Sequence, residues 1–202
     1  MSNTRAVSHE DSAALRGEHG HDLHWPVPLW TQIPLAGAIC AALAWAFGAD
    51  RVLVLLVPFA VLLSAITVID LRELRVPNRL LAPAAAAALP LLLVAASSTW
   101  PDLSLARALL GAAAMGAVYF TLAMIHPAGM GFGDVKLAPL IGATLALFGW
   151  VPFVRGLFLA FLIVGPVAII LLLLQRAGAK TGLPFAPFMA AGAIVALILE
   201  TL

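Results

Sequence analysis

The chain has 202 residues, of which 63% are hydrophobic and only 10% are charged. An ordinary soluble domain is about 45–50% apolar and about 25% charged. A single core in a chain of this size cannot hide so much apolar surface from water, so the composition excludes a water-soluble globule. The apolar content also excludes disorder for most of the chain. The remaining class is a protein that crosses a membrane several times.

The first 28 residues form a polar segment that differs from the rest of the chain. They lack the apolar core of a cleavable signal peptide. We predict a disordered tail over residues 1–28 and a membrane-embedded domain over residues 29–202. The histidines of the stretch HGHDLH in this tail could hold a metal ion weakly, but a solvated tail is the simpler interpretation. We therefore expect no metal site and no cofactor.

From Leu29 onward, apolar stretches follow one another, separated by short polar or Gly/Pro-rich joints. They are apolar around the whole circumference and near the length of about 20 residues that spans a bilayer, which indicates helices rather than barrel strands. Small residues such as Gly111 and Gly116 favour close approach of neighbouring helices. We predict an all-α, polytopic transmembrane bundle of about seven spans. The predicted spans are 29–48, 52–69, 80–96, 103–125, 135–150, 152–175 and 187–201.

The lysines and arginines of the joints predict the orientation, because short cytoplasmic loops are enriched in these residues. If the joint at 70–79 is cytoplasmic, most of the 11 basic residues fall on that side. With seven spans, the N-terminus is then cytoplasmic and the C-terminus lies outside. The basic residues form no clustered face, so we expect no nucleic-acid partner.

Two aspartates stand out because ionisable groups in or beside a membrane are costly and indicate function. Asp70 ends the second predicted span in ITVIDLRELRVPN, and Asp134 opens the fifth in GMGFGDVKL. Two intervening spans return the chain to the same side, so the two carboxyls can face each other. Two close carboxyls share a proton. Aspartic-type peptide hydrolysis needs such a pair, because the ionised acid activates water and the protonated acid hydrogen-bonds the scissile carbonyl.

Each acid also has a structural interpretation. Asp134 precedes VKLAPL and suits the N-cap of a helix. Asp70 suits an interfacial anchor paired with Arg72 or Arg75. If both interpretations hold, the protein is a non-enzymatic membrane scaffold.

Three neighbouring residues are weaker candidates. Asn78, which follows a proline, is typical of a turn and a helix cap. Gly131 and Gly133 allow positive φ or the close approach of a substrate backbone. A lone Gly-x-Gly pattern has little specificity.

Taken together, these motifs resemble those of the type IV prepilin peptidases, which are membrane aspartic proteases of the GxGD class. DLRELRVPN and GFGDVKL carry the likeness, LPFAPFMAAG at 183–192 resembles a further segment, and the whole covers roughly residues 50–192. The resemblance implies that Asp70 and Asp134 are the catalytic pair and that Gly131 and Gly133 shape the loop presenting Asp134. The predicted substrate-binding or supporting residues are Gly131, Gly133, Asn78 and Lys136.

The resemblance also implies the substrate and the location. The expected substrates are prepilin or pseudopilin precursors, each a short basic leader followed by one apolar helix, cut at the cytoplasmic face of a prokaryotic plasma membrane. Long members of the family carry an insert with paired Cys-x-x-Cys motifs and also methylate the new N-terminus. Because this chain has only Cys40, we predict a peptidase without S-adenosylmethionine-dependent methyltransferase activity.

A proton-coupled transporter is the alternative from another functional class. Two membrane acids would then act as proton carriers. That function predicts acids nearer the bilayer midplane and a polar pathway through several spans, and the sequence shows neither.

Overall fold

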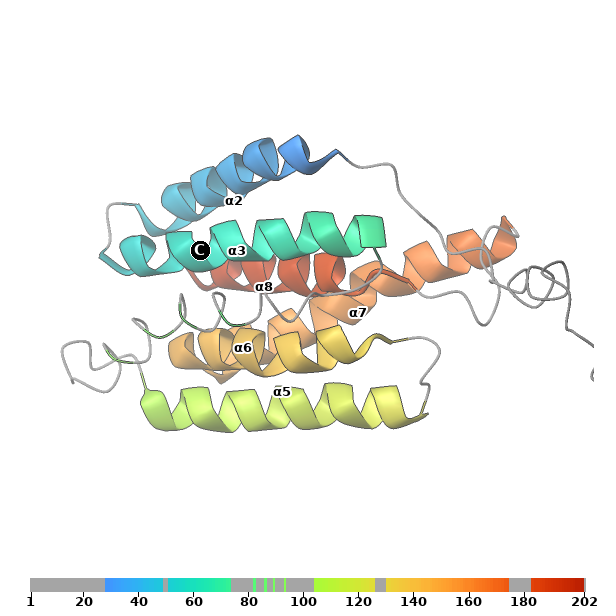
Figure 1. Ribbon diagram of the computed structural model, residues 1–202. Coiled ribbons are helices and arrows are strands. Elements are labelled where there is room, and N and C mark those ends of the chain that lie inside the picture. Colours follow the sequence, from blue (N-terminus) through green and yellow to red (C-terminus); the bar gives the residue numbers. More distant parts are fainter. Residues whose placement is uncertain are drawn as a thin grey trace, which may run out of the picture.

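The protein is helical in the computed structural model. The structure describes residues 28–48, 51–73, 104–125, 130–174 and 183–201, with the single positions 82, 86, 89 and 93. Within these residues, a 3-10 turn, η1 (Leu29–Thr31), leads into six α-helices and there is no strand. The helices are α2 (Gln32–Phe47), α3 (Arg51–Glu73), α5 (Leu105–Ile125), α6 (Phe132–Phe148), α7 (Trp150–Leu173) and α8 (Ala186–Glu200) (Figure 1).

These helices confirm the predicted all-α class. Each coincides with one of the predicted apolar stretches, although the ends differ by a few residues. The helix α6, for example, begins at Phe132, three residues before the predicted start at 135, so Asp134 belongs to its first turn. The predicted span 80–96 and the predicted tail fall almost wholly outside the described residues. The span number and the orientation stay predictions.

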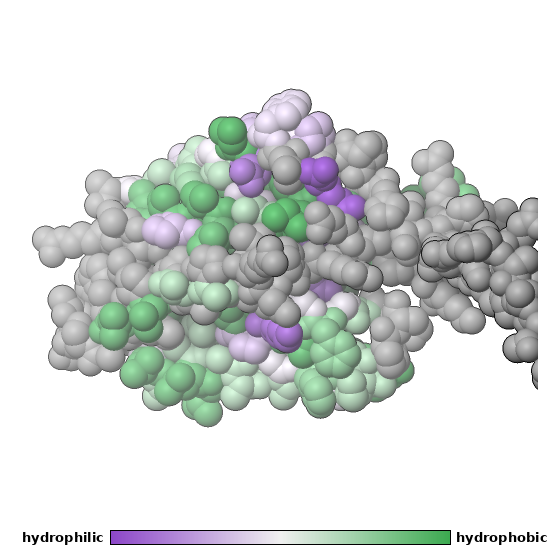
Figure 2. Space-filling model, viewed as in Figure 1, coloured by the Kyte–Doolittle hydropathy of each residue, from purple (hydrophilic) through white to green (hydrophobic). Residues whose placement is uncertain are grey.

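Two of the helices, α5 and α7, are long and apolar enough to cross a membrane by length and composition. The helices α2 and α8 are apolar but have only 16 and 15 residues. Large apolar side chains point outward from α7, where Phe158 and Leu162 are each 68% exposed. Figure 2 shows apolar side chains gathered on the lower part of the molecule, where α5 lies in Figure 1. An exposed apolar surface of this kind is typical of a protein that contacts lipid or a partner.

The helix α8 lies at the centre of the bundle, although it is the last in the sequence. It contacts α2, α3, α6 and α7. Small residues allow this close packing. A Cβ atom added at Gly192 of α8 would lie only 2.7 Å from the backbone nitrogen of Ala160 in α7. The N-terminus of α8 lies beside the last turn of α3, where the Ala186 N–H bonds to Asp70.

Candidate active site

The two candidate aspartates are both buried, and they lie at the ends of different helices. Asp70 is in the last turn of α3 and is 2% exposed, whereas Asp134 is in the first turn of α6 and is 3% exposed. The charge of Asp70 acts on Asp134. The fold therefore brings the two carboxyls within electrostatic reach of each other, although two predicted spans separate them in the sequence.

The carboxyl of Asp70 points toward the N-terminus of α8. Its Oδ2 atom accepts a hydrogen bond of 3.1 Å from the backbone N–H of Ala186, the first residue of that helix. The first N–H groups of a helix have no partner within the helix, and their partial positive charge stabilises an anion. Asp70 is thus buried and turned inward, which contradicts an anchor at the membrane surface.

Asp134 is not the N-cap of its helix, so that interpretation was wrong. The N-cap is Gly131, whose backbone is extended, and the Asp134 N–H donates to the Gly131 carbonyl oxygen at 3.1 Å. The Asp134 side chain therefore does not cap the helix. Its Oδ1 atom is buried and has no hydrogen-bond partner among the residues that the structure describes. Such an atom is costly to bury and is available to a water molecule or a substrate.

Neither glycine before Asp134 has an unusual backbone. Within the described ranges, only Gly48 and Gly149 have positive φ, so of the two alternatives for Gly131 and Gly133, positive φ is excluded, and close approach of a substrate backbone stays a prediction. A Cβ atom at Gly131 would lie 3.4 Å from Oδ2 of Asp134. This is an ordinary van der Waals distance, so an alanine at Gly131 would touch the carboxyl without displacing it.

Of the other two predicted supporting residues, the structure describes only Lys136. Lys136 is exposed, whereas Asp134, two positions earlier on α6, is buried. Residues two positions apart on a helix do not face the same way. Asn78 lies outside the described residues.

Tyr119 of α5 is a neighbour of the site that the motifs do not include. It is the only tyrosine of the chain, is 1% exposed, and interacts electrostatically with Asp134. Its ring centroid lies 5.7 Å from that of Phe161 and 5.8 Å from that of Phe185. Phe185 directly precedes Ala186, whose N–H bonds to Asp70. The aromatic cluster is therefore linked to Asp70 through Phe185 and to Asp134 through Tyr119. The only signal in the sequence is one polar aromatic residue in an apolar stretch.

Burial changes the acidity of the two aspartates, which lie just beyond the predicted spans 52–69 and 135–150. Loss of water raises the pKa of Asp70, and the N–H of Ala186 partly opposes this rise. Loss of water also raises the pKa of Asp134, the negative charge of Asp70 adds to the rise, and the Gly131 backbone partly opposes it. The pair therefore retains one proton to a higher pH than isolated aspartates would. Asp70, which has the N–H donor, is the better placed of the two to carry the negative charge.

The arrangement offers a general base and a proton donor in one buried site. Among the described residues, no group of three His, Cys, Asp or Glu side chains is placed to hold a metal ion. What the two carboxyls can do together is to activate a water molecule and polarise a carbonyl group.

Comparisons with known proteins identify a family and two relatives that this chain resembles. The model of the type IV leader peptidase family matches residues 56–172, which include both aspartates. A prepilin leader peptidase/N-methyltransferase of Pseudomonas putida is 28% identical over 173 residues, which cover 82% of this chain and 58% of the relative. A protein of the same name from Bacillus subtilis (strain 168) is 31% identical over 182 residues, which cover 89% of this chain and 68% of the relative. No solved structure matches the chain significantly.

Proposed function

The chain belongs to the type IV leader peptidase family, and from this premise we propose that it is a membrane aspartic endopeptidase that removes the leader of prepilin-like precursors. One observation carries the proposal: Asp70 and Asp134 are buried at adjoining helix ends and interact electrostatically within the matched region. The protein would be a multi-pass protein of a prokaryotic plasma membrane and would cut at its cytoplasmic face. The basic residues of the joint at 70–79 support that orientation.

The hydrogen bonds of the site suggest separate roles for the two acids. Ionised Asp70 takes a proton from water while the water oxygen attacks the scissile carbonyl carbon, and Asp134 gives its proton to the carbonyl oxygen. The tetrahedral intermediate then collapses and the C–N bond breaks. The departing nitrogen receives the proton held by Asp70, and Asp134 recovers a proton from the intermediate's hydroxyl. Both acids return to their starting states.

The proposal includes the peptidase activity alone. The two relatives are named as peptidase and N-methyltransferase, and the chain spans 58% and 68% of their lengths. The sequence has a single cysteine, Cys40. It therefore contains no Cys-x-x-Cys pair of the kind that the resemblance links to methylation.

A cleavage assay tests the proposal directly. The purified chain is placed in lipid vesicles with a precursor that has a short basic leader and one apolar helix, and the product is identified by mass and by N-terminal sequencing. We expect a single cut between the leader and the helix. The double variant Asp70→Asn/Asp134→Asn is the control and should leave the precursor intact. A folded wild-type protein that never cuts such precursors but moves protons across the vesicle membrane would support a transporter instead.

The pH dependence of cleavage follows from the shared proton. The singly protonated pair is the active form, so the rate falls at low pH when both acids are protonated and at high pH when both are ionised. Because burial raises both pKa values, the alkaline limb should lie well above the ordinary aspartate pKa of about 4. The measurement is kcat/KM from pH 4 to pH 10, with thermal unfolding followed over the same range. A rate that still rises with pH at pH 10 would contradict a shared proton.

A further inference from the structure

Tyr119 is a buried titratable side chain near the two acids, and no step of the proposed mechanism uses it. It lies on α5 and is 1% exposed, so it is as buried as Asp70 and Asp134. Its phenol can donate one hydrogen bond, and a phenol with the ordinary pKa of about 10 keeps its proton at neutral pH. Tyr119 is therefore a neutral donor in the same buried region as the pair.

The helices α5 and α6 run side by side in opposite directions, which brings Tyr119 level with the start of α6 (Figure 1). A Cβ atom added at Gly142 would lie 2.5 Å from the carbonyl oxygen of Gly111. Further along α5, a Cβ atom added at Gly116 would lie 2.9 Å from Cγ of Pro139, which comes earlier on α6. About one more turn of α5 reaches Tyr119, opposite the first turns of α6, where the second acid lies.

Two aromatic rings hold the phenol of Tyr119 in place. Its ring stacks on that of Phe161 in α7, with 5.7 Å between the centroids and 30° between the planes. It also meets the ring of Phe185 edge to face at 5.8 Å. Phe185 directly precedes Ala186, whose N–H bonds to Asp70 at 3.1 Å. The ring is thus fixed from α7 and from the start of α8, and a fixed donor needs no reorganisation during a reaction.

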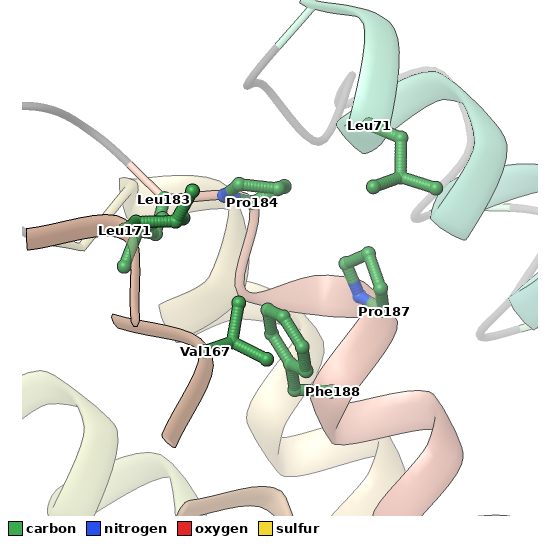
Figure 3. A pocket seen from close by; sticks show the side chains of 7 residues that line it. All are labelled: Leu71, Val167, Leu171, Leu183, Pro184, Pro187 and Phe188. Atoms are coloured by element: carbon green, nitrogen blue, oxygen red, sulfur yellow. The ribbon is translucent and has the colours of Figure 1, made fainter. Parts of the chain in front are cut away.

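The apolar cavity at the end of α3 offers no such donor. It has a volume of about 190 Å³, and Leu71, the residue after Asp70, is one of the side chains that line it. Figure 3 shows these seven side chains, from α3, α7 and the start of α8, and all of them are apolar. An oxygen that gains negative charge between the acids finds no side-chain donor on this wall. The α5 wall has one in Tyr119.

We propose that Tyr119 is a third catalytic residue, whose hydroxyl donates a hydrogen bond to the scissile carbonyl oxygen as the carbonyl carbon becomes tetrahedral. The inference rests on the proposed function, in which Asp134 gives its proton to the same oxygen. Tyr119 and Asp134 interact electrostatically, and Oδ1 of Asp134 has no partner in the described part of the chain. A substrate oxygen at that atom accepts hydrogen bonds from the carboxyl and from the phenol. Tyr119 keeps its own proton throughout, and its hydrogen bond strengthens as negative charge grows on the oxygen.

Tyr119→Phe tests the proposal, because phenylalanine keeps the ring and removes only the hydroxyl. Loss of one donor to a developing oxyanion typically lowers kcat by about 10²–10³-fold. We expect a loss of that size in kcat with KM nearly unchanged, since the interaction is made mainly in the transition state. The measurements are kcat and KM for cleavage in vesicles, with Tm as the check on folding.

Thr144→Val is the matched control, because it also removes a buried hydroxyl. Thr144 is 1% exposed and donates to the Leu140 carbonyl oxygen at 3.0 Å within α6. It lies about 15 Å along the helix axis from Asp134. The control should therefore cut precursors with the wild-type kcat.

A second measurement tests the proposal if Tyr119→Phe does not fold. The chain has a single tyrosine, so incorporation of 3-fluorotyrosine places one ¹⁹F nucleus at position 119. The precursor is added to labelled Asp70→Asn, which retains Asp134 but does not cleave. We expect the ¹⁹F resonance to shift on binding of the precursor. The same apolar helix without the leader and the cleaved bond should leave the resonance unchanged.

The results that contradict the proposal are distinct from those that contradict the proposed function. Wild-type kcat in a folded Tyr119→Phe, even with a lower Tm, would give Tyr119 a role in packing alone. Equal losses of kcat in Tyr119→Phe and Thr144→Val, or a ¹⁹F resonance that the precursor does not shift, would also overturn the catalytic hydroxyl. Wild-type protein that cuts no precursor would overturn the proposed function itself.

Discussion

Replacing Asp134 by asparagine is expected to reduce precursor cleavage by about 10²–10⁴-fold or more, because the variant loses the shared proton of the catalytic pair. Asparagine has nearly the same shape, so the fold should persist. Asp70→Asn should lose activity to a similar degree, since its amide oxygen can still accept the Ala186 N–H but cannot take a proton from water. The measurement is kcat/KM for each single variant in vesicles.

The same substitution should alter the pH dependence of stability in a direction that a damaged fold would not show. Between the ordinary pKa of aspartate and the raised pKa of Asp134, the folded protein binds more protons than the unfolded chain. The free energy of unfolding of the wild type therefore falls as pH rises through that window. Asparagine does not titrate, so the Tm of Asp134→Asn should exceed that of the wild type at alkaline pH.

A matched control is available at the other end of α8. Glu200 is also an acid near a helix end, but it is exposed and pairs with Arg155 at 3.6 Å. Glu200→Gln should cleave precursors at the wild-type rate. Near-normal cleavage by either Asp70→Asn or Asp134→Asn would exclude the catalytic pair and would favour a purely structural role for these acids.

Gly142→Ala is expected to lower stability strongly. The helices α5 and α6 meet at Gly111 and Gly142, and a Cβ atom at Gly142 would lie 2.5 Å from the carbonyl oxygen of Gly111 and 2.6 Å from Cβ of Met115. The first contact is with backbone, so the two helices have to separate. Overpacking of this kind costs about 2–3 kcal/mol, the upper part of its usual range. For a chain of this length, the Tm should fall by roughly 4–12 °C.

The control for this variant is the same change at an open position. Among the described residues, no atom lies within 4 Å of a Cβ atom added at Gly37 in α2. Gly37→Ala should therefore leave Tm unchanged or raise it slightly, because alanine favours a helix over glycine by roughly 0.5–1 kcal/mol. Thermal unfolding of both variants in the same detergent checks the pair. Equal Tm values for Gly142→Ala and Gly37→Ala would show that the α5–α6 contact is looser than the structure has it.

Separation of α5 from α6 should also disturb the candidate active site. Tyr119 lies on α5 and Asp134 on α6, and the two interact electrostatically. A shift of one helix against the other changes that interaction, so Gly142→Ala should lower kcat at temperatures where it is still folded.

The elements of the fold follow closely from the sequence, because an apolar stretch of nearly membrane length has few alternatives to a helix. The ends of the helices are less well determined. The sequence alone suggested Asp134 as a cap, whereas the structure has Gly131 at that position. A cap depends on where the preceding backbone turns, and that turn depends on contacts with other helices.

By itself, the sequence determined the helical class and singled out the two acids that we propose as the catalytic pair. In a chain with only 10% charged residues, an acid at the end of an apolar stretch is conspicuous without any knowledge of its neighbours. The local sequence pattern also placed the segment around Pro187 at the start of the last helix.

Only the tertiary structure decided what surrounds the acids. The N–H of Ala186 bonds to Asp70, Tyr119 interacts electrostatically with Asp134, and Leu71 lines an apolar pocket. Each of these contacts joins residues far apart in the chain, and none has a local sequence pattern. The physical reason is that small residues in α8 and at the α5–α6 contact let the helices pack closely, and this packing sets which helix ends meet.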